Sequence, residues 1–163
     1  PSACEERDTI ISCGPDTAMP HCLGTGQLHA NQPIVMDVFP RNLKTGYFAD
    51  MTRTIAKGAP AKEIIQMYET VHAAKELAAD MLGPGITGAE VHNAVVAFFT
   101  KKGYETAGAS GFIHSLGHGV GLEIHEGPSL SPSGGILELG RVVDDLPVSP
   151  VAVGRVGIRV GGG

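Results

Sequence analysis

The apolar positions of the chain follow two different periods, which separate helical segments from strand-like ones. Over residues 60–82, apolar side chains recur at intervals of three and four with charged residues between them, which predicts a long amphipathic helix. A second helix should follow, because Thr87 and Glu90 form a capping box just before the next apolar face. Residues 9–13 and 33–39 are instead short β-rich runs bounded by turn-forming residues.

The second β-rich run leads into a predicted hairpin that carries two acidic residues. Residues 40–46 contain proline, asparagine and glycine, and residues 47–55 resume an apolar, β-branched pattern. The hairpin would place Asp37, in the first strand, beside Asp50, in the returning strand. Short β-like runs come back after residue 108, so the order of strands, two helices and strands predicts the α+β class.

Length, charge and cysteine content exclude several classes of protein. A chain of 163 residues can build one hydrophobic core, so we expect a single domain over residues 1–163. The formal net charge of −5 offers no basic surface to nucleic acid, and no apolar run is long enough to span a membrane. Neither nucleic acid nor a membrane is therefore an expected partner. Three cysteines without C-x-x-C spacing argue against a disulfide framework and indicate a cytoplasmic location.

The segment 111–128 has the highest density of chemically active side chains. It contains three histidines, His114, His118 and His125, together with two glutamates and several glycines. Glycines leave room for imidazole rings to reach a metal ion or a substrate. A single histidine is more often structural, so the cluster as a whole is what indicates a site.

The aspartates of the hairpin point to a cation. Asp37 lies in an apolar strand, where an ionised carboxylate costs several kcal/mol to bury unless it is paired or metal-bound. Arg53 could neutralise one carboxylate, but Asp50 brings a second negative charge, and two like charges repel unless a cation lies between them. Carboxylates combined with one imidazole favour a divalent ion such as Mn, Co, Fe or Zn.

Four segments together resemble a known family. They are residues 13–21, which include Cys-Gly-Pro-Asp and Met-Pro-His, and residues 36–38, 46–54 and 114–128, which hold the aspartates and histidines above. In this order they resemble the pita-bread metallopeptidases, which include methionine aminopeptidase, aminopeptidase P and prolidase, with creatinase as a metal-free relative. The Asp-x-Thr-Arg and His-x-x-Gly-His-Gly-x-Gly-x-x-x-His-Glu patterns are most similar to the Xaa-Pro branch, aminopeptidase P and prolidase. The resemblance implies a curved antiparallel sheet backed by helices. It also implies that the chain is one catalytic domain, incomplete at both ends.

The resemblance assigns roles to the acidic residues and the histidines. Asp37 and Asp50 would be bridging or bidentate ligands and His118 the imidazole ligand of two divalent ions, which activate a shared water for peptide hydrolysis. His21 and His125 would be catalytic imidazoles on the substrate side, donating to the peptide carbonyl and its developing charge. His114 would support His118 or line the substrate pocket. The implied substrate is a small peptide containing proline. The resemblance leaves open whether the chain forms a homodimer.

The carboxyl end departs from the family pattern. Leu146 and Gly161 stand where the family has two glutamate ligands, the first of which also serves as a proton shuttle. Three interpretations compete: a non-catalytic member, a truncated or misassigned C-terminal sequence, or replacement of the first glutamate by Asp144, which shares a strand face with Leu146. We favour the second interpretation, and the ions would then be absent or only partly bound in this chain.

Two other functions stay open from the sequence. A pita-bread domain without its full metal shell could be an inactive peptide-binding or interaction module, and a creatinase-like enzyme could hydrolyse amidines without metal. The retained pair Asp37 and Asp50 argues against both, because a metal-free site does not need two convergent carboxylates. We therefore expect a metal-dependent peptidase that cleaves before proline.

Overall fold

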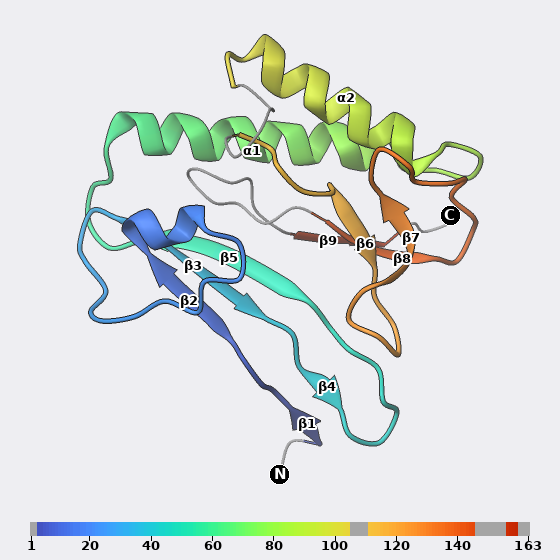
Figure 1. Cartoon of the computed structure of the whole chain (residues 1–163), viewed down its shortest axis with the longest axis horizontal. Helices are drawn as coiled ribbons and strands as arrows, with labels where there is room; N and C mark the ends of the chain where they lie inside the picture. Colours follow the sequence, from blue (N-terminus) through green and yellow to red (C-terminus); the bar gives the residue numbers. More distant parts are fainter. Residues whose placement is uncertain (1–2, 105–110, 146–155, 160–163) are drawn as a thin grey trace.

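Antiparallel sheets and two long helices make up the described part of the chain, which is residues 3–104, 111–145 and 156–159 of a computed structural model (Figure 1). The α+β class expected from the sequence is confirmed. In chain order the elements are β1 (Cys4–Glu5), β2 (Ile10–Cys13), η1 (Gly14–Ala18), β3 (Pro33–Val38), β4 (Arg41–Asn42), β5 (Met51–Ala56), α1 (Lys62–Met81), α2 (Gly88–Lys101), β6 (Gly117–Gly119), β7 (Glu126–Leu130), β8 (Val142–Asp145) and β9 (Val156–Arg159).

The predicted hairpin supplies β3 and β5 of the first sheet, in which the strand order is β2-β3-β5. Asp37 pairs with Thr52 in the antiparallel register of β3 and β5. The returning strand begins at Met51, not at Tyr47 as expected. The difference arises because the intervening residues close a turn of their own, in which Arg41 bridges to Phe48 and β4 pairs with β1.

Both helices form where the apolar periodicity predicts them. At the start of α2 the Thr87 hydroxyl accepts the backbone N–H of Glu90 at 3.1 Å, and the Glu90 carboxylate accepts the backbone N–H of Thr87 at 2.8 Å. These two reciprocal bonds satisfy N–H groups that a helix start leaves without partners. The bonds from Thr87 also lower the pKa of the Glu90 carboxyl. The capping box expected from the sequence is therefore confirmed.

The second sheet carries the histidine-rich segment and has the strand order β7-β6-β8-β9. The register of β6 against β7 shifts between His118 and Gly119. A Cβ atom at Gly119 would lie 2.3 Å from the carbonyl oxygen of Gly127, so no side chain fits at this close approach of two backbones. The glycine beside His118 is therefore a requirement of the bulge.

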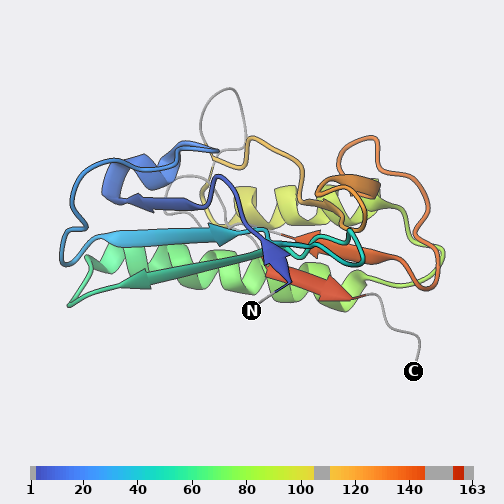
Figure 2. The ribbon, with the colours of Figure 1, turned by 90° about the horizontal axis from the view of Figure 1, so that it is seen from below.

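The core lies between the two helices and the second sheet. Figure 1 shows α1 running along both groups of strands, and Figure 2, seen from below, shows the strands in front of the two helices. The buried apolar residues of this core are Val71, Ala74, Ala78, Val91, Val95, Phe99, Phe112, Leu116, Leu130, Leu137 and Val143. Neither helix in the described ranges has both the length and the apolarity that crossing a membrane requires.

One histidine lies inside this core. His92 is 6% exposed, and its ring centroid lies 5.2 Å from that of Phe112. The Phe112 ring also packs against the rings of Phe99 and His114. Val95 and Phe99 follow His92 at helical spacing on the buried face of α2. The spacing of His92 from these apolar residues could have predicted a buried histidine, but His92 was not among the site residues predicted from the sequence.

We expect His92 to make the stability of the fold depend on pH. Burial lowers the pKa of His92, the nearby His114 lowers it further, and a hydrogen bond to the backbone of Leu130 acts in the opposite direction. The unfolded chain, where the pKa is near its ordinary 6.5, therefore binds the proton more readily than the folded chain. The free energy of unfolding should fall as the pH drops below that value, and urea denaturation at a series of pH values measures it.

The matched control for this prediction is His72, which lies on an exposed position of α1. His92→Gln should lose most of the difference in unfolding free energy between neutral and mildly acidic pH, because glutamine takes up no proton. His72→Gln should keep that difference. An unchanged pH dependence in His92→Gln would show that another group is responsible.

Candidate metal centre

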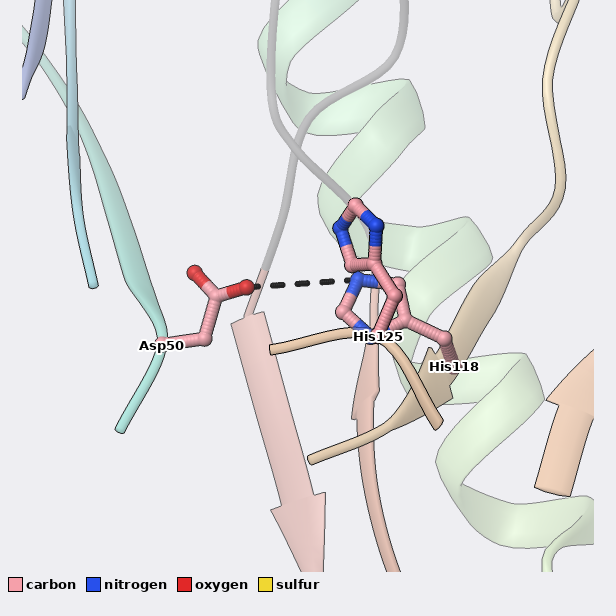
Figure 3. Close-up of side chains that lie close together, drawn as sticks. All are labelled: Asp50, His118 and His125. Atoms are coloured by element: carbon pink, nitrogen blue, oxygen red, sulfur yellow. Dashed lines mark ion pairs between the residues drawn. The ribbon is translucent and has the colours of Figure 1, made fainter. Parts of the chain in front are cut away.

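Asp50 lies directly before β5, at the junction between the two sheets. Its side chain is 0% exposed, and its Oδ2 lies 3.9 Å from Nε2 of His118 (Figure 3). The backbone N–H of Phe48 donates to the carbonyl oxygen of Gly121 at 2.8 Å, which holds the loop of Asp50 against the histidine-rich segment. Two segments that are far apart in the sequence therefore meet at this carboxylate.

His118 reaches the site from the middle of β6. Its Nδ1 lies 3.1 Å from the carbonyl oxygen of Gly119. A carbonyl oxygen only accepts hydrogen bonds, so Nδ1 carries the ring hydrogen and the neutral ring leaves Nε2 with a lone pair. Nε2 faces Asp50, and this orientation is the one that histidine ligands of metal ions adopt.

His125 comes from the bend between β6 and β7 and is exposed. Its ring centroid lies 4.1 Å from that of His118, with the ring planes inclined at 64°. One ligand atom each from Asp50, His118 and His125 lies within 4.8 Å of the other two. A Cβ atom at Gly121 would lie 2.4 Å from the Glu126 carboxylate, so a larger residue there would displace this exposed side chain.

The other predicted site residues lie outside this group in the described part of the chain. Asp37 is 4% exposed and accepts the hydroxyl of Thr52 at 2.6 Å. His21 is exposed in the loop after η1, where its backbone has a φ of 60°. His114 directs Nδ1 to the carbonyl oxygen of Ser115 at 2.7 Å. Among the described residues, the ligand atoms of Asp50, His118 and His125 therefore form one group, of which Asp37, His21 and His114 are not members.

Two further predictions concern the carboxyl end. Leu146 and Gly161, at the expected glutamate positions, lie outside the described residues. Asp144, the suggested replacement, pairs with His118 in the backbone register of β8 and β6, but its side chain also lies outside the description. Arg53, the suggested neutralising partner of an aspartate, donates from Nη1 to the carbonyl oxygen of Thr52 at 2.8 Å.

The donor atoms of the group fit a divalent cation. The Asp50 carboxylate is buried, and its Oδ2 lies 3.9 Å from Nε2 of His118. One carboxylate oxygen and two imidazole nitrogens are a donor set that suits divalent transition ions. The chemistry available at this place is therefore the binding of a metal ion beside an exposed imidazole.

Comparison with known proteins identifies relatives that have the same fold. The sequence pattern of metallopeptidase family M24 matches residues 2–161. An uncharacterized peptidase of Bacillus subtilis is 36% identical over 141 residues, which are 86% of this chain and 38% of that protein. The Xaa-Pro dipeptidase of Pyrococcus furiosus is 38% identical over 125 residues, 76% of this chain and 34% of that protein.

The structural comparison gives the same result. The crystal structure of the prolidase from Pyrococcus horikoshii has a TM-score of 0.83 and 32% identity, and the match covers 95% of this chain and 45% of that one. The fold is therefore the pita-bread fold that the sequence motifs implied. The chain spans less than half the length of each of these relatives. With the family pattern matching nearly its whole length, the chain belongs to metallopeptidase family M24.

Proposed function

We propose that this chain takes part in the metal-dependent hydrolysis of the peptide bond before proline in small peptides. The observation that carries the proposal is the buried carboxylate of Asp50, whose Oδ2 lies 3.9 Å from Nε2 of His118 and whose ligand atom groups with that of the exposed His125. The relatives support the substrate class, because one is an Xaa-Pro dipeptidase and another a prolidase.

Different residues of the chain would bind the ions and the substrate. Asp37, Asp50 and His118 would hold two divalent ions, with the two aspartates as bridging or bidentate ligands and His118 as the imidazole ligand. Such ions, when bound, acidify a water molecule and polarise the scissile carbonyl. His21 and His125 are proposed as catalytic imidazoles on the substrate side, where their N–H groups would donate to the peptide carbonyl, and His114 is proposed to support His118 or to line the substrate pocket.

Several finer features belong to the same proposal. We propose two ions, chosen among Mn, Co, Fe and Zn, because carboxylates and imidazoles together suit this group of metals. A single domain and assembly into a homodimer are retained as proposals. The three cysteines are free thiols, which supports a cytoplasmic location.

A pair of matched peptides tests the substrate assignment. An Xaa-Pro dipeptide should be hydrolysed in the presence of Mn²⁺, and the same two residues in the order Pro-Xaa should not. The products are measured by release of free proline. Equal cleavage of both peptides would contradict the specificity, and tight binding of Xaa-Pro peptides without cleavage would favour a peptide-binding module.

A further inference from the structure

The segment 112–116 lies directly before β6 and carries His114 between two buried residues (Figure 1). It forms neither a helix nor a strand, so it lacks the regular backbone hydrogen bonds of those elements. Phe112 and Leu116 are buried in the core, whereas His114 is only partly buried. The position of the His114 ring therefore depends on how Phe112 and Leu116 are held.

His92 packs against the first of these two residues. Its ring centroid lies 5.2 Å from that of Phe112, and the ring planes are inclined at 33°. The Phe112 ring in turn meets the His114 ring edge-on, with a centroid distance of 5.3 Å and an angle of 68°. Aromatic rings favour offset and edge-to-face contacts at such distances, which restrict where each partner can lie. A single ring therefore connects His92 with His114.

His92 is also linked to the second buried residue, through the backbone of β7. The carbonyl oxygen of Leu130 accepts the backbone N–H of Leu116 at 2.7 Å. His92 forms a hydrogen bond to the backbone of the same Leu130. Because Nδ1 of His92 has no hydrogen-bond partner among the described residues, Nε2 makes this bond. One histidine of α2 is thus linked to both ends of the segment that carries His114.

A histidine is an unfavourable residue for a core position that only fills space. Buried polar atoms are normally hydrogen-bonded, and leaving one without a partner costs free energy. Val95 and Phe99 occupy the same buried face of α2 with apolar side chains, which carry no such cost. The histidine therefore indicates a task beyond packing, and its contacts point to the segment 112–116.

We propose that His92 is a positioning residue for His114: it fixes both ends of the segment 112–116 and thereby sets the place of the His114 ring. The inference rests on the proposed function for the role of His114, which it assigns to lining the substrate pocket. His92 itself lies in the core and acts only through its neighbours. Small displacements of a group that contacts substrate weaken binding or catalysis, so the effect of His92 should be measurable.

The ring signals of His114 in nuclear magnetic resonance spectra test the positioning without any activity assay. His92→Leu removes both the ring contact and the hydrogen bond, so the His114 signals should shift and broaden. Val71→Ala is the matched control, because it truncates a buried side chain of the same core on α1 and should leave these signals in place. Unchanged His114 signals in His92→Leu, or an equal shift in the control, would overturn the proposal.

Two further variants separate the two contacts of His92 and keep the test valid if His92→Leu does not fold. His92→Phe keeps an aromatic ring against Phe112 but cannot donate to Leu130. His92→Gln keeps a donor but loses the ring. Each variant should shift the His114 signals, and by less than His92→Leu does. Wild-type signals of His114 in both variants would contradict the positioning role.

Steady-state kinetics with an Xaa-Pro dipeptide connects the positioning to the proposed function. The KM of His92→Leu should rise by about 2–10-fold, the factor that one hydrogen bond contributes, and its affinity for Mn²⁺ should stay that of the wild type. A purely structural role would lower the amount of active chain, and therefore kcat, without changing KM. Equal KM values in wild type and His92→Leu would overturn the proposal. Shifted His114 signals in a chain that hydrolyses no Xaa-Pro peptide would confirm the positioning and contradict only the proposed function.

Discussion

Asp50→Asn is expected to lose metal binding by at least about 100-fold, more than an outer-shell substitution costs. The reason is the position of the carboxylate, which is fully buried and supplies the negative charge of the site. Asparagine has nearly the same shape but no charge, so the fold should persist. The same substitution should remove hydrolysis of Xaa-Pro peptides, because the ion that activates water would no longer be held.

Thermal unfolding with and without metal measures this loss. An ion at about 100 times its dissociation constant stabilises the folded chain by about 2.7 kcal/mol, which raises the melting temperature. The wild type should show this rise with added Zn²⁺, and Asp50→Asn should show little or none. Asp80→Asn, at an exposed position of α1, is the control and should behave like the wild type. Equal stabilisation of wild type and Asp50→Asn by Zn²⁺ would mean that the ion binds elsewhere.

Phe99→Ala is expected to produce the largest loss of stability. Phe99 is 1% exposed and its ring contacts those of Phe98, Tyr104 and Phe112. Removing a buried aromatic side chain costs about 3–5 kcal/mol, because apolar contacts are lost and a cavity remains. Domains are typically stable by only about 5–15 kcal/mol, so this loss alone should bring the chain close to unfolding.

Urea denaturation followed by far-ultraviolet circular dichroism measures the effect, since the chain has no tryptophan for a fluorescence signal. Phe98→Ala is the matched control, because Phe98 precedes Phe99 in the same helix but is only partly buried. Its loss should be clearly smaller. Similar losses in the two variants would contradict the placement of Phe99 at the centre of the core.

Local signals explain which elements could be predicted from the sequence. The start of α2 depends on Thr87 and Glu90, three residues apart, so the sequence contains all the groups that form the capping box. The beginning of β5 depends instead on how residues 41–48 close on themselves and on the pairing of β4 with β1. That pairing joins distant residues, so the expected strand began four positions too early.

The candidate site likewise has features that local sequence predicts and features that depend on contacts between distant residues. Asp50 and His118 could be chosen from their residue types and motifs, because an aspartate at the base of a hairpin and a histidine between glycines are visible in the sequence. The approach of His125 to Asp50 depends on the contact between Phe48 and Gly121, which joins two distant loops. No local pattern contains that contact. The motif identified His125 as a site residue, but its place beside Asp50 emerged only from the structure.

Metal-dependent turnover tests the central claim most directly. The chain is stripped with a chelator and then titrated with Mn²⁺ and, separately, Zn²⁺, while bound metal and release of proline from an Xaa-Pro dipeptide are measured in the same samples. Hydrolysis should be absent from the stripped chain and should rise in proportion to the bound metal. Hydrolysis that does not depend on metal, or a chain fully loaded with metal that releases no proline, would contradict the proposed function.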